Sequence, residues 1–341
     1  MSKSLFITSI PAFYKLNLYN ELCHKIDIDV IFLANGTKEK RANDFITINA
    51  DFPFEVLSRS PYQKRNPLHN IIKIIKSIKN GRYERVIIGG WDAVEYWFIL
   101  FFVRKVEFQL VLESSIEESS TNYLKSKLKI IFLSKISRVY ASGKKHKKLL
   151  DYLGYNKVTV ITNGVGIINK GKKINPPKIY QKNFLFVGRI EKVKNLQFLI
   201  SVFNNLPKYN LNIIGVGPEE VNLKKRIKGD NIRFLGSIPN NNLSDYFLKT
   251  NFLILPSISE PWGLVIEEAL YNKIPVILSS ACGSSDLVND YRNGYLIDPY
   301  NQNELIKILK SIDQLTYSMM LKNIDSNFID KKDQFQVNAY L

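Results

Sequence analysis

The sequence predicts an α/β protein made of two Rossmann-like domains, each with a doubly wound parallel sheet. Short apolar runs that end in Gly or Pro alternate with helix-like segments through both halves of the chain. The length of 341 residues suits two domains of about 100–200 residues each. A polar segment rich in Pro and Gly, residues 169–178, separates the halves. We therefore expect an N-terminal domain over 1–168, a linker over 169–180 and a C-terminal domain over 181–325.

Periodicity and turn residues place the individual elements. In the first half the expected strands are 5–10, 29–34, 54–57, 85–89, 109–113 and 137–141, and the expected helices are 14–25 and 70–79. In the second half we expect strands at 184–187, 211–218 with its glycine turn, 234–239, 252–257 and 274–278. Ligands of such sheets bind beyond the carboxyl ends of the strands. We therefore expect one cleft to be shared by the residues that follow these ends: Arg189, Gly215, Ile238, Glu260 and Gly283.

The stretch SEPWGLVIEEAL, residues 259–270, holds two carboxylates eight positions apart around a predicted helix start. Pro261 and Gly263 indicate a loop, and the helix after it would present backbone N–H groups suited to a phosphate. A diphosphate there could place a sugar near Glu260 and a ribose near Glu268, about 7–8 Å along the helix from Gly263. An ordinary amphipathic helix with two solvated glutamates explains the same spacing.

Residues 184–194, FLFVGRIEKVK, combine an apolar strand, a turn at Gly188 and two cations. The planar guanidinium of Arg189 and the ammonium of Lys194 would leave the strand together, where both could hold a diphosphate. Solvated surface charges are the alternative interpretation.

Five segments of the second half occur in a characteristic order: VGRIEKVKN, GVGPEE, FLGSIPNNNLSDYFLKTNFLILPS, SEPWGLVIEEAL and NGYLIDP. In this order and spacing, over residues 157–300, the chain resembles a retaining glycosyltransferase of family 4 (glycosyl transferases group 1). The resemblance implies the GT-B architecture, in which two Rossmann-like domains face each other across a cleft. It places the donor in the second domain and the acceptor in the first. Residues 326–341 would cross back to the N-terminal domain.

The resemblance also implies roles for particular residues. Arg189 and Lys194 would grip the diphosphate of a nucleotide-sugar, and Glu260 would contact the donor sugar near the reacting centre. These three are the implied catalytic residues. Ile238 would lie along the base, Glu268 would bind the ribose hydroxyls, and backbone amides at Gly263 and Leu264 would complete the phosphate site beside Gly188. The segment from Cys282 to Val288 departs from the family pattern, because Asp286 stands where a Glu is usual.

The sequence offers no evident general base. His24, His69 and His146 are the only histidines, and none has a partner pattern that suggests catalysis. Glu113 follows a predicted strand and could bind the acceptor, although a structural role is an equal alternative. In the reaction that the resemblance implies, the departing diphosphate accepts the acceptor's proton, so the protein supplies orientation and charge stabilisation. We expect no cofactor and no metal, with a UDP-sugar as co-substrate.

Charge is the most unusual feature of the composition, with a formal net charge of +17. It peaks at residues 122–150, which hold nine Lys or Arg and no acid, interleaved with apolar residues near helical spacing. Such a helix can rest on an anionic membrane surface, or it can pack its apolar side on the sheet and leave its lysines solvated. We expect no nucleic-acid binding, because no recognisable module or aromatic platform accompanies the charge. No signal peptide is evident at the start, and the apolar run 97–103 is far shorter than the ~20 residues of a membrane span.

These observations predict a cytoplasmic hexosyl- or N-acetylhexosaminyl-type transferase, peripheral on the inner face of the cell membrane. The acceptor would be a saccharide, lipid-linked, in the synthesis of capsule, O-antigen or exopolysaccharide. Two alternatives stay open: a non-catalytic partner subunit of a transferase complex, and a GT-B sugar phosphorylase or epimerase. A nicotinamide-dependent dehydrogenase is disfavoured, because no G-x-G-x-x-G follows the first strand.

Overall fold

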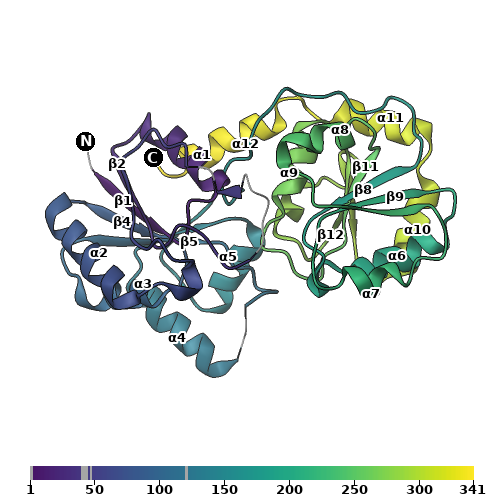
Figure 1. The fold of residues 1–341 in the computed structure, drawn as a ribbon. Coiled ribbons are helices and arrows are strands. Elements are labelled where there is room, and N and C mark those ends of the chain that lie inside the picture. Colours follow the sequence, from purple (N-terminus) through teal and green to yellow (C-terminus); the bar gives the residue numbers. More distant parts are fainter. Residues whose placement is uncertain (1–2, 40–44, 47, 120–121) are drawn as a thin grey trace. The chain divides into compact units, whose positions relative to one another are not determined.

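The computed structural model describes residues 3–39, 45–46, 48–119 and 122–341. The chain divides into two compact units (Figure 1). Unit 1 holds residues 1–169 and 333–341, and unit 2 holds residues 170–332. The segment expected as a linker, 169–180, lies almost wholly in unit 2. Its backbone is fixed there, since Ile174 N–H donates to Asn272 Oδ1 at 3.1 Å and Tyr180 N–H to Gln314 Oε1 at 2.8 Å.

Unit 1 has a sheet of seven parallel strands within the described residues, in the order β3-β2-β1-β4-β5-β6-β7. The strands are β1 (Ser4–Thr8), β2 (Ile28–Phe32), β3 (Phe54–Val56), β4 (Arg85–Ile88), β5 (Glu107–Leu112), β6 (Arg138–Ala141) and β7 (Val158–Ile161). The helices are α1 (Phe13–Cys23), α2 (Pro67–Gly81), α3 (Val94–Phe102), α4 (Tyr123–Ser134) and α5 (Lys144–Tyr152).

Helices cover both faces of this sheet. Buried side chains of α2 to α5, among them Ile74, Ile99, Phe132 and Leu149, form one core with the strands. Those of α1 and the chain's end, among them Leu16, form another. In Figure 1, α2, α3 and α4 lie below the sheet and α1 lies above it. The unit is thus a three-layer α/β structure.

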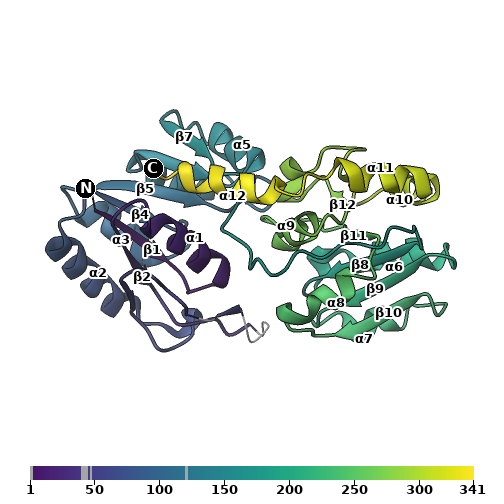
Figure 2. The same ribbon diagram turned by 90° about the horizontal axis from the view of Figure 1, so that it is seen from above.

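The end of the chain is part of unit 1. Helix α12 (Phe328–Asn338) begins in unit 2, and the residues from Asp333 onward belong to unit 1. There the Tyr340 ring stacks on Tyr140 with centroids 4.3 Å apart, and Arg85 Nη2 donates to Tyr340 O at 2.8 Å. The last residues therefore close one face of the first sheet (Figure 2).

Unit 2 has a six-stranded parallel sheet within the described residues, in the order β10-β9-β8-β11-β12-β13. The strands are β8 (Asn183–Val187), β9 (Asn210–Ile214), β10 (Ile232–Gly236), β11 (Phe252–Leu255), β12 (Val276–Ser279) and β13 (Gly294–Ile297). The helices are α6 (Leu196–Asn204), α7 (Glu220–Lys224), α8 (Leu243–Phe247), α9 (Leu264–Tyr271), α10 (Gln302–Ser311) and α11 (Gln314–Asn323). Helices α6 and α10 lie on the opposite side of the sheet from α9 in both ribbon views (Figures 1 and 2). The inner strands β11 and β12 are fully buried, as parallel strands covered on both faces require.

The predicted fold class, two Rossmann-like parallel-sheet domains, is confirmed. Several elements differ from expectation. Strand β10 ends at Gly236, where φ is +73°, and β12 begins only after Pro275, which has no N–H to donate. Strands β7 and β13 and helix α3 were missed, because two short runs and an almost entirely apolar helix show little periodicity. Across the described residues, no helix is both long and apolar enough to span a bilayer.

Candidate functional site

The strand order of unit 2 reverses between β8 and β11. From β8 the chain moves outward through β9 to β10, and from β11 it moves the other way through β12 to β13. The loops after β8 and β11 therefore separate at this point, where doubly wound sheets bind their ligands. Lys194 follows β8 and Glu260 follows β11, so both predicted residues lie at the switch point.

Lys194 and Glu260 are in direct contact. Lys194 ends the short 3₁₀ helix η3 (Lys192–Lys194), and its Nζ donates to Glu260 Oε2. The two loops are tied by the backbone, since Ile258 N–H donates to Val193 O at 2.8 Å. The side chains are 16% and 12% exposed, so the charges are largely shielded but can still be reached from solvent.

Asn195 joins the loops of three strands, a role the sequence analysis missed. Its Nδ2 donates to Pro256 O at 3.3 Å, after β11, and to Pro299 O at 2.8 Å, after β13. Its own backbone lies after β8 with φ of +57°, and it begins α6. The sequence feature that could have indicated this role is an Asn between a basic turn and an apolar helix, because Asn tolerates the left-handed conformation found here.

The glycines after β8 and β9 allow two loops to touch through their backbones. A Cβ on Gly215, whose φ is +139°, would lie 1.8 Å from Gly188 O, and one on Gly217 would lie 2.3 Å from Ile190 O. Gly188 N–H donates to Ile214 O at 3.0 Å, and Gly215 N–H donates to Gly236 O at 2.8 Å. The motif GVGP therefore holds the loop of Arg189 against its neighbours.

Helix α9 begins at Gly263, as predicted, with φ of +94° at that residue. Within the described part of the chain, no side chain caps this start. The helix is anchored by the residue beside Glu268: Glu267 is fully buried and accepts hydrogen bonds from Trp262 Nε1 at 2.6 Å and Lys332 Nζ at 2.8 Å. One of the two adjacent acids is thus structural, and half-buried Glu268 lies on another side of the helix.

The loop of Glu260 is paired with the loop after β12. Glu260 and Cys282 form an isolated parallel bridge, Gly283 N–H donates to Glu260 O at 2.9 Å, and Ser284 N–H donates to Trp262 O at 3.1 Å. Asp286, the departure from the family pattern, follows in the 3₁₀ helix η5 (Gly283–Leu287). The expected neighbourhood of Glu260 and Gly283 is therefore present.

Other predicted residues lie farther from this contact or have other partners. Arg189 Nη2 pairs with Glu191 Oε1, and its side chain is 43% exposed. Ile238 is half-buried, two residues beyond the edge strand β10. Glu268 is on α9, beyond the helix start at Gly263 and Leu264. The structure thus brings Lys194 together with Glu260, and distributes the others over the carboxyl ends of the same sheet.

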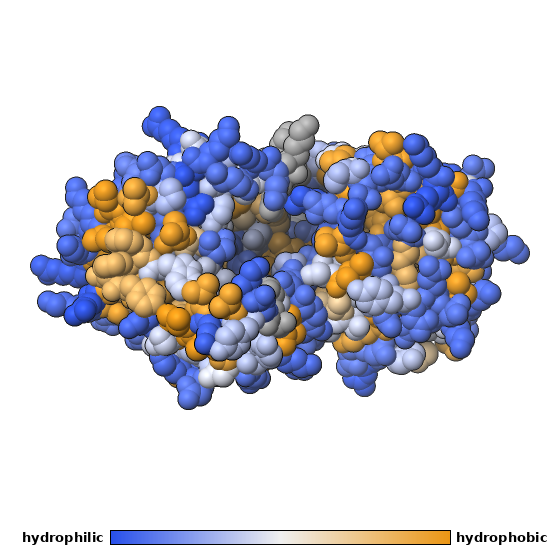
Figure 3. Space-filling view, turned by 90° about the horizontal axis from the view of Figure 1, so that it is seen from below, coloured by the Kyte–Doolittle hydropathy of each residue, from blue (hydrophilic) through white to orange (hydrophobic). Residues whose placement is uncertain are grey.

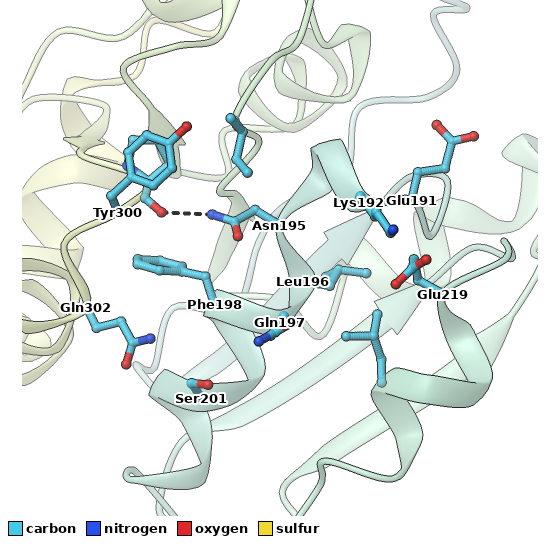
Figure 4. Close-up of a pocket in the computed structure, with 13 residues that line it drawn as sticks. Glu191, Lys192, Asn195, Leu196, Gln197, Phe198, Ser201, Glu219, Tyr300 and Gln302 are labelled. Atoms are coloured by element: carbon cyan, nitrogen blue, oxygen red, sulfur yellow. Dashed lines mark hydrogen bonds between the residues drawn. The ribbon is translucent and has the colours of Figure 1, made fainter.

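A cavity of about 510 Å³ lies beside this site (Figure 4). Glu191, Lys192 and Asn195 line it from the β8 loop, and Phe198, Glu219 and Tyr300 from neighbouring segments. Lys194 and Glu260 are not among its lining residues. The cavity therefore belongs to the outer side of η3 and is distinct from the Lys194–Glu260 contact.

In unit 1, partly exposed Glu113, after β5, forms a charged cluster with buried Lys15, after β1. Lys15 Nζ lies 3.0 Å from Glu113 Oε1 and donates to Thr8 Oγ1 at 2.9 Å. Burial opposes the charge on Lys15, but the carboxylate of Glu113, together with the neighbouring Tyr14 and Tyr19, outweighs burial and raises the pKa of the lysine. Burial also raises the pKa of Tyr19 to about 12. His146 Nε2 lies 3.1 Å from Glu113 O, so this histidine has a structural contact with the strand end.

The arrangement in unit 2 suits an anionic ligand with hydroxyl groups. Lys194 offers a cation, the start of α9 offers backbone N–H groups at the positive end of a helix dipole, and Glu260 offers an acceptor for hydroxyls. A diphosphate would compete with Glu260 for Lys194 and leave the carboxylate able to bind a sugar.

Residues 169–323 match the family described as glycosyl transferases group 1. Two curated proteins are similar in sequence. An uncharacterised 41.2 kDa protein in the cps region of Klebsiella pneumoniae is 30% identical over 46% of this chain and 46% of its own length. The O-antigen biosynthesis glycosyltransferase WbnH of Escherichia coli is 28% identical over 67% of each. The chain thus spans about half the length of the first of these relatives.

Solved structures share the fold over nearly the whole chain. Sucrose-phosphate synthase of Thermosynechococcus elongatus superposes with a TM-score of 0.77 at 17% identity, covering 99% of this chain and 96% of that one. HepE of Anabaena, in complex with UDP-glucose, superposes with a TM-score of 0.73 at 16% identity, covering 100% and 98%. Residues 169–323 therefore resemble the glycosyl transferases group 1 family in sequence, and the chain as a whole has the GT-B fold of these solved structures.

Proposed function

We propose that this chain is a retaining glycosyltransferase that moves a sugar from a UDP-sugar to a saccharide acceptor carried on a lipid, in cell-surface polysaccharide synthesis. The observation that carries the proposal is the Lys194–Glu260 contact at the switch point of unit 2. It supports the proposal because a cation and a carboxylate lie together beside the helix start at Gly263, where a diphosphate and a sugar could each find a partner. The relatives named for O-antigen synthesis and for a cps region support the pathway class, and HepE with UDP-glucose supports the donor class.

Each residue then has a chemical task. Lys194, Arg189 and the first N–H groups of α9 stabilise the charge that develops on the departing diphosphate, so no metal ion is required. Glu260 orients the donor sugar, and Glu268 binds the ribose. The leaving oxygen accepts the acceptor's proton on the face of the sugar from which it departs, which retains the anomeric configuration.

The test is transfer from labelled UDP-glucose, UDP-galactose and their N-acetylated counterparts to lipid-linked saccharides from a bacterial membrane extract, with and without EDTA. We expect one donor to give a lipid-soluble product whose new linkage, by NMR, has the donor's α configuration, at a rate unchanged by EDTA. A β linkage contradicts retention, and loss of the reaction with EDTA contradicts metal independence. Release of sugar 1-phosphate from the saccharide when inorganic phosphate is supplied in place of the UDP-sugar indicates a phosphorylase.

A further inference from the structure

One side of unit 1 exposes apolar side chains from two adjacent helices. On α3 they are Phe98, Phe101 and Phe102, and on α4 they are Leu124, Leu128 and Ile131, which together we name the α3–α4 face. Phe102 and Leu124 are each 69% exposed. Figure 3 shows apolar surface gathered on the part of unit 1 that α2, α3 and α4 form. Patches of this kind mark interaction sites in soluble proteins.

The two helices meet where the C-terminal end of α4 approaches α3, so their exposed residues lie on adjoining surfaces. The Trp97 ring of α3 meets the Phe132 ring of α4 with centroids 4.9 Å apart, and Lys135 Nζ lies 5.6 Å from the centre of the Phe101 ring. Leu124, Leu128 and Ile131 repeat every three or four residues and so line one side of α4. Phe132 and Leu133 point into the core instead, so the core does not account for the exposed stripe.

Cations surround this face. Residues 94–106 and 122–137 contain a single acid, Glu95, which is fully buried and held by Arg65 Nε at 2.7 Å. The same two segments hold six cations: Arg104, Lys105, Lys125, Lys127, Lys129 and Lys135. Lys127 Nζ lies 4.4 Å from the centre of the Tyr123 ring, so the cations are mixed with the aromatic rings.

We propose that the α3–α4 face docks unit 1 on an anionic lipid membrane, with the aromatic and aliphatic side chains in the interface and the lysines on the lipid headgroups. The occupant is inferred from charge complementarity, since a surface with cations and no exposed acid in these two segments matches an anionic bilayer. A protein partner fits less well, because lysine is depleted in protein–protein interfaces. The inference rests on the proposed function, for which it places the enzyme where its lipid-linked acceptor lies.

The test is co-sedimentation with vesicles of phosphatidylcholine alone and of an equimolar mixture with phosphatidylglycerol. We expect binding to the mixed vesicles that weakens with salt. Lys125→Gln with Lys127→Gln should weaken binding about fivefold for each charge removed. Phe102→Ser with Leu124→Ser should weaken it at least about tenfold, because several buried CH₂ groups are lost.

Matched controls lie on unit 2. Lys225→Gln with Lys228→Gln removes two exposed cations, and Leu315→Ser with Val221→Ser removes two exposed apolar residues. Neither pair should change vesicle binding. Stabilisation of each variant by UDP reports separately on the donor site, so a failed donor site and a failed docking surface give different results.

Three outcomes overturn the proposal. The first is equal sedimentation of the wild type with neutral and mixed vesicles at low salt. The second is equal binding by the wild type and both α3–α4 variants. The third is a dimer in analytical ultracentrifugation that the Phe102→Ser, Leu124→Ser variant dissociates, because a second copy of the chain would then cover the α3–α4 face.

Discussion

Lys194, after β8, donates a hydrogen bond to the carboxylate of Glu260, after β11, across the point where the strand order of unit 2 reverses. The two residues are 66 positions apart in sequence. Each neutralises the other in a largely shielded position. A ligand that carries both a diphosphate and a sugar can separate the pair by giving each residue a new partner.

Removing Lys194 and removing Glu260 should have different effects on the enzyme. Lys194→Ala should weaken UDP binding about 10–100-fold, because a hydrogen bond to a charged group contributes about 1.5–3 kcal/mol. Glu260→Gln should leave the Kd for UDP within about twofold and reduce kcat at least about tenfold, because Glu260 acts on the sugar. Calorimetry and steady-state rates measure the two effects. Lys192→Ala, which removes an exposed cation from the same turn, is the control for charge alone; a UDP affinity reduced equally by both lysine variants would contradict the assignment.

The glycine pair after β8 and β9 gives a prediction about stability. Gly215→Ala should destabilise the protein by at least about 2 kcal/mol, because the new Cβ meets Gly188 O and the backbone has an unfavourable φ. Gly236→Ala is the matched control: its φ is +73°, but nothing lies within 4 Å of an added Cβ, so only about 1–2 kcal/mol of backbone strain is expected. Urea unfolding compares the two, and an equal loss would show that the close approach of the loops is not required.

The adjacent acids of α9 should give opposite phenotypes. Glu267→Gln removes the carboxylate that neutralises buried Lys332 and should cost about 3–5 kcal/mol of unfolding free energy. Glu268→Gln should leave stability within about 0.5 kcal/mol and weaken UDP binding instead. Thermal unfolding and UDP titration of both variants measure the two effects. Loss of UDP binding in Glu267→Gln together with loss of stability in Glu268→Gln would contradict the assignment of the two roles.

Acid should remove one stabilising interaction of unit 2. Burial alone would raise the pKa of Asp330, but hydrogen bonds from Lys170 at 2.6 Å and Lys173 at 2.9 Å outweigh it and lower that pKa below the ordinary value of 3.8. A lowered folded pKa gives stability that is complete above the unfolded pKa and is lost as the pH falls through the folded one. Asp330→Asn should therefore lower the free energy of unfolding in urea at pH 7, by less than about 1 kcal/mol in this partly exposed site. The difference from wild type should shrink as the pH falls below 3.8 and should vanish only below the lowered pKa of folded Asp330; a difference that persists at that acidity would have another cause.

The sequence predicted the parallel sheets and the positions of the site loops because both depend on residues that are close together in the chain. Buried strands such as 252–255 are continuous apolar runs, and Gly263 with Pro261 indicates where a loop ends and α9 begins. The family resemblance selected Glu268, but the sequence did not show that the neighbouring Glu267 is structural, because that role depends on Trp262 and on Lys332, which is 65 residues away.

Other features depended on contacts that spacing does not encode. Asn195 reads as one more polar residue until Pro256 and Pro299 are brought beside it. The exposed aromatic rings of α3 were read only as a short apolar run, since the core takes other residues of that helix, among them Tyr96 and Ile99. The basic character of α4 was predicted; that its apolar stripe adjoins α3 required the structure.

The proposed function requires unit 2 to bind a nucleoside diphosphate through Lys194. The most direct measurement is the unfolding temperature of wild type and Lys194→Ala with saturating UDP, GDP, ADP, CMP and dTDP, each with and without magnesium. A ligand at 100 times its Kd adds about 2.7 kcal/mol of stability. We predict selective stabilisation of the wild type by UDP without magnesium, and little or none of the variant. If no nucleotide stabilises the wild type, or if UDP stabilises both proteins equally, unit 2 does not bind a nucleoside diphosphate through Lys194.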